Sequence, residues 1–228
     1  LFQSLGYDYL GNWEKRPKNS AVEFAQLEAF LRKNGANSAQ ISAVETTINR
    51  KLAALHQSLY EANRKIYNLL RYGVQVRTSV EQPSETIRLI DWEHPENNDF
   101  AIAEEVTLSQ GDDVRRPDLV LYLNGFAVGV IELKRSSVTM GDGIRQLITN
   151  QQDNPYFFVA AQLVFAGNDT EGLYYGTCMT SEQFFVRWKE KHDQPSTVPG
   201  CHLDVPLSQM CEKSRLLDFM HDCVIFDG

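Results

Sequence analysis

The fold is decided by the stretch RRPDLVLYLNGFAVGVIELK, which spans residues 115–134. It consists of two apolar runs joined by Asn124-Gly125, and Asn-Gly between apolar runs is the strongest short-range signal of a β-hairpin. The open end of this hairpin carries Asp118 on one strand and Glu132 and Lys134 on the other. Charged side chains beside apolar strands are unfavourable unless they are paired or bind a ligand. The sequence therefore predicts a central hairpin with a charged site at its open end.

The spacing of the three charges makes a demand on the hairpin. Glu132 and Lys134 are two residues apart, so they share one face of a strand. With an ideal two-residue turn, however, Asp118 falls opposite Ile131 and points away from Glu132. A three-residue loop or one β-bulge would bring Asp118 opposite Glu132. The alternative is a surface ion pair at a strand end, which contributes little to stability. Pro-Asp, the two apolar strands and the turn together favour a metal site, which requires such an irregularity.

The same residues carry a resemblance. Pro117-Asp118 followed by Glu132-Leu133-Lys134 resembles the PD-(D/E)xK nuclease signature. The surrounding text is similar to the R (restriction) subunit of type I restriction-modification enzymes, and this likeness extends over nearly the whole chain. The similar stretches are residues 67–74, 89–92, 97–102, 115–125, 143–146, 216–219 and 224–228.

The resemblance implies a fold and a function. The expected fold is α/β, with a mixed central sheet flanked by helices in a restriction-endonuclease-like core. The expected function is a metal-dependent endonuclease that hydrolyses phosphodiester bonds of unmodified foreign duplex DNA. Cleavage would follow ATP-driven translocation by a motor beyond residue 228. The implied partners are a methyltransferase subunit and a specificity subunit, which find the DNA site.

The implied chemistry assigns a role to each charged residue. Asp118 and Glu132 would bind Mg²⁺, or Mn²⁺ as a substitute, with the backbone carbonyl of Leu133 as a third ligand. Bound Mg²⁺ polarises a phosphate and acidifies an attacking water. Lys134 would orient that water or neutralise charge that builds on the phosphate.

Further candidates lie outside the hairpin. Related nucleases carry a Gln-x-x-x-Tyr motif on the next helix, which suggests Gln146 as a supporting residue, although Asn150 stands where the tyrosine is expected. The alternative for Gln146 is a helix-surface glutamine. An additional carboxylate could come from Glu61 or from one of Glu104 and Glu105, since alternation lets only one of those two face the site.

Charge bears on how the chain meets DNA. The net charge of −8 is unusual for a nucleic-acid binder, whose affinity comes from neutralising phosphates. Besides Lys134, the basic residues expected around the site are Arg115, Arg116, Arg135 and Arg145; for the last two, a solvated surface charge is an equal alternative. We expect weak duplex binding without sequence preference, because no helix-turn-helix, zinc or ribbon signal is present.

Several classes of protein are excluded or disfavoured by what the sequence lacks. The chain has no Gly-Lys dipeptide and so no P-loop, which restricts any ATP binding to the motor. It has no run of about 20 apolar residues and no signal-peptide pattern. Its four cysteines are scattered without metal spacing. We expect a cytoplasmic, monomeric fragment that starts without Met and touches no membrane.

Periodicity predicts three regions. They are a helical region at 1–73 packed on the core, a nuclease core at 74–192, and a connection with a helix at 193–228. Within them, Ser20 and Glu23 form a capping box for a first helix ending at 34–35. A long helix, or two in line, covers 38–72. Strands are expected at 74–80, 86–92, 100–108, 157–166 and 173–179, besides the hairpin, and helices at 141–152, 184–191 and 208–226; residues 194–206 form a Pro-rich connection.

Two alternative functions remain open from the sequence. One is a catalytically silent module that docks a motor onto a partner complex. The other is a DNA-repair nuclease of the same fold. Loss of Asp118, Glu132 or Lys134 would favour the docking module, and all three are present. The flanking text favours restriction over repair.

Overall fold

A mixed seven-stranded sheet forms the centre of the computed structural model, which describes residues 1–53, 58–77, 83–110, 113–190 and 202–226. The strand order is β1-β4-β7-β8-β9-β10-β11. The β1–β4 and β8–β9 pairs are parallel and the others are antiparallel. The strand bounds are β1 Asp8–Asn12, β4 Phe100–Glu104, β7 Leu119–Leu123, β8 Phe126–Leu133, β9 Leu163–Asn168, β10 Gly172–Thr177 and β11 Val186–Arg187. The predicted α/β fold class with a mixed central sheet and flanking helices is confirmed.

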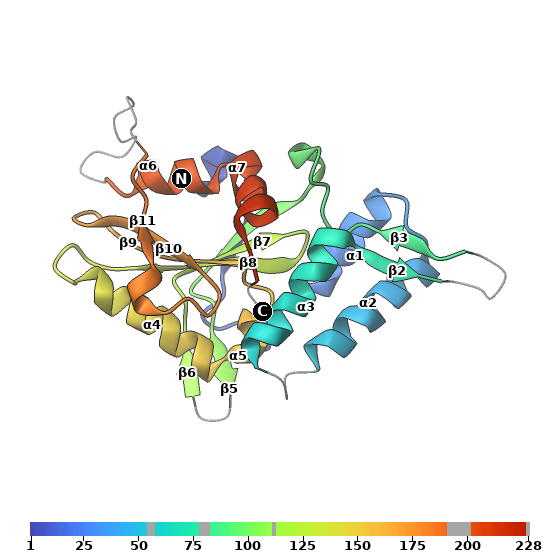
Figure 1. Cartoon of the computed structure of the whole chain (residues 1–228), viewed down its shortest axis with the longest axis horizontal. Coiled ribbons are helices and arrows are strands. Elements are labelled where there is room, and N and C mark those ends of the chain that lie inside the picture. Colours follow the sequence, from blue (N-terminus) through green and yellow to red (C-terminus); the bar gives the residue numbers. More distant parts are fainter. Residues whose placement is uncertain (54–57, 78–82, 111–112, 191–201, 227–228) are drawn as a thin grey trace.

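Helices cover both faces of this sheet. Helix α4 (Met140–Asp153) lies on one face and helices α6 (Asp204–Cys211) and α7 (Lys213–Asp218) lie on the other, as Figure 1 shows. The strands between them are almost wholly buried: every residue of β9 and all but the last of β8 are inaccessible to solvent. Such continuous apolar strands are typical of a sheet that is covered on both faces.

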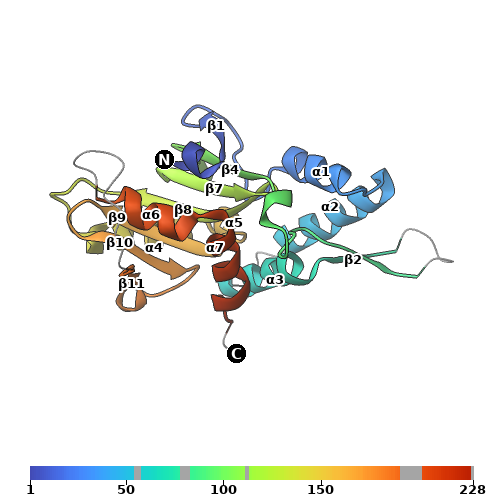
Figure 2. The ribbon, with the colours of Figure 1, turned by 90° about the horizontal axis from the view of Figure 1, so that it is seen from above.

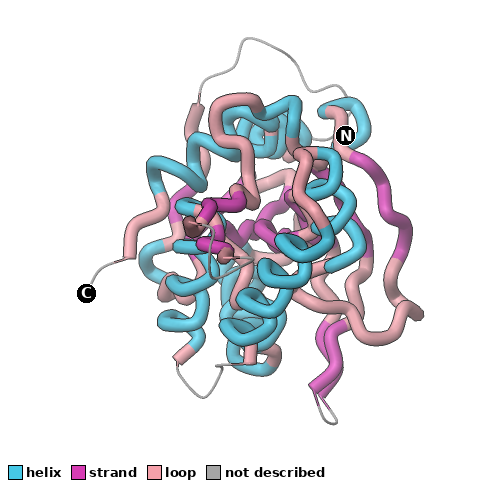
Figure 3. The backbone as a smooth tube through the Cα atoms, turned by 90° about the vertical axis from the view of Figure 1, so that its right-hand side faces the viewer, coloured by secondary structure: helices cyan, strands magenta, loops and turns pink. Residues whose placement is uncertain are grey.

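A helical region stands at one end of the sheet. It contains α1 (Phe24–Lys33), α2 (Ser38–Leu52) and α3 (Leu59–Tyr72), followed by a two-stranded ribbon of β2 (Val74–Val76) and β3 (Glu85–Ile87). Figure 2 shows the ribbon extending beyond these helices, and Figure 3 shows the same end face-on. The apolar positions of α2 and α3 are buried, so these helices face the core of this chain rather than a partner.

The first helix begins later than predicted. Ser20 does not cap it; its hydroxyl instead donates to the carbonyl of Val22. Residues 21–23 are extended and bonded to the central hairpin, because the Ala127 N–H donates to Ala21 and the Glu23 N–H donates to Gly125. The capping box is therefore wrong, and α1 starts at Phe24 where this pairing ends. It stops at Asn34 and Gly35, as predicted.

Other predicted elements need correction. Helices α2 and α3 pack side by side instead of running in line, with Ser58 capping α3. The expected strand 100–108 is interrupted at Glu105, whose φ is +51°, and continues as β5 (Leu108–Gln110), paired with β6 (Asp113–Arg115). The strand predicted at 86–92 is shortened to β3. Residues 78–80 of the strand predicted at 74–80 and residues 194–201 of the predicted connection lie outside the described residues.

Two apolar or aromatic segments were assigned the wrong structure. The run 157–166 is not one strand: α5 (Pro155–Phe158) precedes β9, because Pro155 occupies the first turn of a helix, where proline fits. The predicted helix 184–191 is wrong for its described residues: a 3₁₀ turn (Glu182–Phe184) ends at its first residue, β11 follows, and residues 188–190 are not helical. The predicted helix 208–226 is divided into parts of α6, α7 and the π-helical turn Phe219–Cys223.

One buried cluster connects these elements. It includes residues of α1–α3, of the central strands and of α6 and α7. Segment 1–73 also supplies β1 and a 3₁₀ turn (Phe2–Leu5), which periodicity did not reveal, and a further 3₁₀ turn covers Pro95–Asn97. The three-region division at residues 73 and 192 stays a prediction.

Candidate active site

The central hairpin contains the irregularity that its charges require. Asn124 and Gly125 form its two-residue turn, with φ of +49° and +87°. Pairing runs regularly from this turn until Leu121 faces Gly129, and Val128 is left as an extra residue. This β-bulge brings Leu119 opposite Ile131, so that Asp118 lies opposite Glu132. The predicted shift of register is confirmed.

Hydrogen bonds hold Asp118 at the end of this ladder. Its Oδ2 accepts from the backbone N–H of Leu133 at 2.6 Å. Its own carbonyl accepts from the N–H of Glu105 at 2.9 Å. Asp118 is thereby tied to both neighbouring strands, and its carboxylate is fixed beside Glu132.

Lys134 connects the hairpin to the following helix. Its Nζ donates to Oε1 of Glu132 at 2.6 Å and also to Oε1 of Gln146 on α4. Glu132 and Lys134 therefore share a face, as predicted. The helix approaches so closely because it carries Gly143 at this level: a Cβ there would lie 3.2 Å from Cγ of Lys134. The lysine side chain thus occupies the space that a side chain at position 143 would fill.

Burial sets the electrostatics of Glu132. Its residue is 2% exposed, and its Oε2 is buried without a hydrogen-bond partner among the described residues. Burial raises the pKa of Glu132 to about 7; the hydrogen bond from Lys134 opposes this shift, and the neighbouring Asp118 adds to it. An unpartnered buried carboxylate oxygen is unfavourable, which indicates a place for a cation.

The raised pKa predicts that stability falls as pH rises. Between pH 4.5, the ordinary value, and about 7, the folded protein keeps a proton on Glu132 that the unfolded chain has lost. Raising the pH through this window should therefore lower the free energy of unfolding by roughly 3 kcal/mol relative to a Glu132→Gln variant, which does not titrate. Urea unfolding of both metal-free proteins at several pH values measures this difference. Parallel pH profiles would contradict it.

These side chains open into one cleft of about 660 Å³. Its residues come from the ends of β6, β7 and β8, from the link after β4 and from α4. They are Glu105, Val114, Arg115, Arg116, Asp118, Glu132, Lys134, Gln146, Thr149 and Asn150. The structure thus brings together Asp118, Glu132, Lys134 and Gln146, which the sequence analysis selected.

Only one of the proposed additional carboxylates faces this cleft. Glu105 lines it, held at a positive φ that places its side chain beside Arg116. Glu104 is exposed and accepts a hydrogen bond from Tyr9, while Glu61 pairs with Arg64 on α3. Only one of Glu104 and Glu105 faces the cleft, as predicted, but the reason is not alternation along one strand, because β4 ends at Glu104 and Glu105 has a positive φ.

The predicted basic strip is largely neutralised. Arg115 pairs with Asp153 at 2.6 Å, and Arg116 pairs with both Glu105 and Glu14. These two arginines line the cleft.

The other two predicted arginines lie outside it. Arg145 pairs with Asp142 and Glu182, and neither Arg145 nor the exposed Arg135 is among the cleft residues. The structure therefore does not gather all four arginines at one place.

Asn150 also belongs to the cleft, although the sequence pattern does not point to it. Asn150 was discounted because it stands where related nucleases have tyrosine, yet it lines the cleft and is 1% exposed. The available signal was its spacing, because a residue four positions after Gln146 lies on the same side of a helix.

The donor set fits a hard divalent cation. Asp118 and Glu132 present carboxylate oxygens from adjacent strands, and Oε2 of Glu132 has no other partner among the described residues. No group of three or more His, Cys, Asp or Glu side chains is arranged for a metal in the part of the chain that the structure describes. Mg²⁺ does not need such a group, since it commonly uses one or two carboxylates and keeps several waters.

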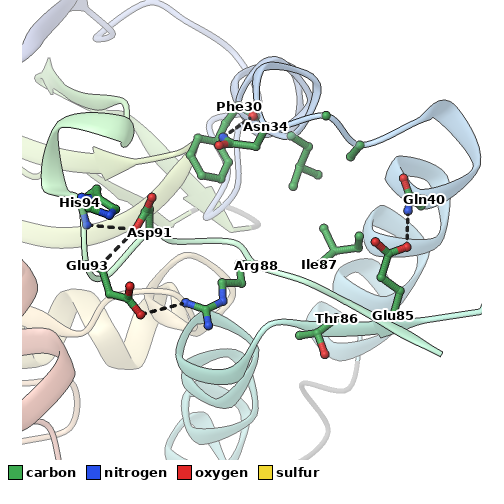
Figure 4. A pocket seen from close by; sticks show the side chains of 13 residues that line it. Phe30, Asn34, Gln40, Glu85, Thr86, Ile87, Arg88, Asp91, Glu93 and His94 are labelled. Atoms are coloured by element: carbon green, nitrogen blue, oxygen red, sulfur yellow. Dashed lines mark hydrogen bonds and ion pairs between the residues drawn. The ribbon is translucent and has the colours of Figure 1, made fainter. Parts of the chain in front are cut away.

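A second pocket, of about 470 Å³, lies between α1, α2 and β3 (Figure 4). Its floor is apolar and its acidic side chains already have partners. Asp91 accepts from backbone N–H groups of its own turn. Glu85 accepts from Gln40, and Glu93 faces Arg88. This pocket lacks the facing carboxylates and lysine of the hairpin cleft.

Fold and site together define a restriction-endonuclease-like core with an acidic pair and a lysine at its cleft. The family model for the N terminus of the type I restriction enzyme R protein matches residues 1–183. The chain belongs to this family, as the sequence resemblance indicated.

Two relatives agree with this assignment. The type I restriction enzyme HindI endonuclease subunit of Haemophilus influenzae is 27% identical over 99% of this chain and 23% of its own length. The MjaIXP protein of Methanocaldococcus jannaschii, which carries the name of a type I restriction enzyme endonuclease subunit, is 26% identical over 71% of this chain and 18% of its own length. The chain thus spans about a fifth of these relatives, and the similarity supports a role in restriction. None of the described helices has the length and apolar character needed to cross a membrane.

Proposed function

We propose that this chain is the metal-dependent nuclease domain of a type I restriction endonuclease subunit and hydrolyses phosphodiester bonds of duplex DNA. The observation that carries the proposal is the bulged hairpin, which places Asp118 opposite Glu132 with Lys134 bonded beside them. The assembled site disfavours a silent docking module, for which none of these contacts would be needed.

In this proposal the residues divide the work. Asp118 and Glu132 hold Mg²⁺, which Mn²⁺ can replace, with the Leu133 carbonyl as a further ligand; the bound ion polarises the phosphate and lowers the pKa of water. Lys134 places its ammonium group next to the reacting phosphate, where negative charge develops during hydrolysis. Gln146 accepts from the ammonium and so orients it. Glu105 adds a third carboxylate at the rim of the cleft.

We further propose that the remainder of the enzyme supplies the other activities. An ATP-dependent motor outside this chain would move the DNA, and methyltransferase and specificity subunits would locate the unmodified site. This division fits a sequence that contains neither a P-loop nor a signal for a base-reading motif.

Metal binding tests the proposed site directly. In crystals soaked with Mn²⁺, we expect an anomalous scattering peak between the carboxylates of Asp118 and Glu132. The peak should disappear in a Glu132→Gln variant, whose amide is a poor ligand for a hard cation. Absence of a peak in the wild-type chain, with the cleft open in the lattice, would count heavily against the assignment.

The paired arginines predict weak DNA binding. Because Arg115 and Arg116 are engaged with carboxylates, few phosphates can be neutralised, and the whole chain carries a net charge of −8. The isolated chain should bind two unrelated duplexes equally and weakly, and binding should fade as salt rises to physiological levels.

The binding that remains would require Arg115 and Arg116 to exchange their carboxylate partners for phosphates. Substituting both arginines by alanine should therefore flatten that salt dependence, whereas Arg135→Ala, outside the cleft, should change it less. Fluorescence anisotropy over a salt series measures both effects. Tight binding that depends on sequence at physiological salt would contradict the idea that partners supply recognition.

A further inference from the structure

Asn150 presents an unused hydrogen-bond donor at the cleft. It lies on α4 one turn after Gln146, is 1% exposed and lines the same cleft as the carboxylates. Its Nδ2 is buried and has no hydrogen-bond partner among the described residues. Buried side-chain amides normally have partners, so an unpartnered one at a functional cleft indicates a missing ligand.

Nδ2 of Asn150 bonds to none of the carboxylate and amide oxygens of the neighbouring site residues. Oδ2 of Asp118 accepts from Leu133, while Lys134 occupies Oε1 of both Glu132 and Gln146. Among the described residues that line this cleft, Glu132 has the other buried atom without a partner, the acceptor Oε2. One unpartnered acceptor and one unpartnered donor thus belong to residues that line the same cleft.

These two atoms differ in what can satisfy them. A cation satisfies the carboxylate oxygen, and an oxygen with lone pairs satisfies the amide donor. A metal ion together with a phosphate group supplies both. A neutral amide can donate to a phosphate oxygen without placing another charge beside the buried carboxylates.

We infer that Asn150 is a substrate-binding residue, whose Nδ2 donates a hydrogen bond to a non-bridging oxygen of the phosphate that is cleaved. This inference rests on the proposed nuclease function and adds to it a contact from α4. The helix would then hold the phosphate from one side while the hairpin carboxylates hold the cation from the other.

The chain offers a matched control one position away. Thr149 also lines the cleft, but its hydroxyl donates to the carbonyl of Arg145 within the same helix. Thr149→Val removes a hydroxyl from the same cleft with little change in side-chain size. That hydroxyl already has an acceptor, so no unused donor is removed. Asn150→Ala removes the donor, and because Nδ2 bonds to nothing in the described structure, no internal bond of that nitrogen is broken.

The experiment uses the full-length endonuclease subunit assembled with its partner subunits. Single-turnover DNA cleavage, ATP hydrolysis and Mn²⁺ affinity are measured for the wild type, Asn150→Ala, Asn150→Ser, Thr149→Val and Lys134→Ala. We expect Asn150→Ala to slow cleavage by about 10- to 100-fold, the range for one hydrogen bond to a charged group. Asn150→Ser, which keeps a shorter donor, should recover part of the rate. ATP hydrolysis and Mn²⁺ affinity should not change, and Thr149→Val should cleave at the wild-type rate.

Thio-substituted DNA separates phosphate contact from a merely structural effect. Sulfur in place of one non-bridging oxygen weakens a hydrogen bond to that position, so it should slow the wild type more than Asn150→Ala. Equal thio effects in the two proteins would overturn the inference. So would a wild-type cleavage rate in Asn150→Ala, or loss of assembly in that variant, which would assign Asn150 to the fold.

Failure of this inference is distinguishable from failure of the proposed function. If Lys134→Ala is inactive while Asn150→Ala cleaves normally, the nuclease site stands and only the phosphate contact is lost. If Lys134→Ala cleaves normally, the proposed function itself is overturned.

Discussion

Lys134→Ala in the assembled enzyme should abolish DNA cleavage while ATP hydrolysis continues at the wild-type rate. The ammonium lies within hydrogen-bond distance of both Glu132 and Gln146, and the lysine side chain is only 18% exposed. Truncation removes the only lysine among the cleft residues and leaves Glu132 buried without its cation. Loss of one preorganised charge-stabilising group typically lowers a rate by about 100- to 1,000-fold, which would bring cleavage below detection in most assays.

Two further variants sharpen this prediction. Lys134→Arg should also be severely impaired, because the larger planar guanidinium cannot take the position from which the compact ammonium bonds both Glu132 and Gln146. Arg135→Ala, at the next position but outside the cleft, should cleave normally. Cleavage of plasmid DNA and release of inorganic phosphate from ATP are measured on the same preparations. Equal loss of both activities in Lys134→Ala would mean that Lys134 is structural.

The second large effect is expected on stability, from Gly125→Ala at the tip of the hairpin. Gly125 has a φ of +87°, and a Cβ there would lie 2.6 Å from the Glu23 carbonyl oxygen and 2.9 Å from the Leu27 nitrogen. Both are backbone atoms at the start of α1 and cannot rotate away. The left-handed conformation and the collision together should destabilise the fold by roughly 3 kcal/mol.

Gly35→Ala is the matched control for this change. Gly35 has nearly the same φ, +86°, but a Cβ there meets no atom within 4 Å. It should therefore lose only the conformational part, about 1 kcal/mol. Urea unfolding followed by circular dichroism gives both free energies. Equal destabilisation by the two substitutions would show that contact with α1 is not what makes Gly125 necessary.

The hairpin was the most predictable element because its determinants are local. Asn-Gly specifies the turn, and the apolar runs specify the strands. The need for a three-residue loop or a bulge followed from counting residues between Asp118 and Glu132, but the choice of a bulge and its position at Val128 did not. In contrast, β1 joins the sheet beside β4, more than 80 residues away in sequence, and no local pattern announces that pairing. The prediction of one strand at 157–166 was wrong because a uniformly apolar run does not distinguish a buried helix from a buried strand.

The site was predictable to a similar degree. Asp118, Glu132 and Lys134 are gathered by one hairpin, and Gln146 by the next helix, so short-range geometry sufficed. Their chemical roles stay predictions. The ion pairs of the two cleft arginines depend on residues far away in the sequence. Arg116 pairs with Glu14, 102 positions earlier, and Arg115 pairs with Asp153, 38 positions later. Sequence alone does not reveal which exposed carboxylate such an arginine will find.

Those arginine ion pairs have a consequence for how such a nuclease could be kept from random damage. A domain whose two cleft arginines are already paired with carboxylates has little affinity for DNA that it meets by free diffusion. A segment held on the same molecule as a DNA-bound partner, however, experiences an effective concentration of about millimolar, which compensates for weak intrinsic binding. Ion pairs at Arg115 and Arg116 would therefore act as a threshold. DNA held by the assembly would reach a local concentration high enough to bind, and DNA elsewhere in the cell would not.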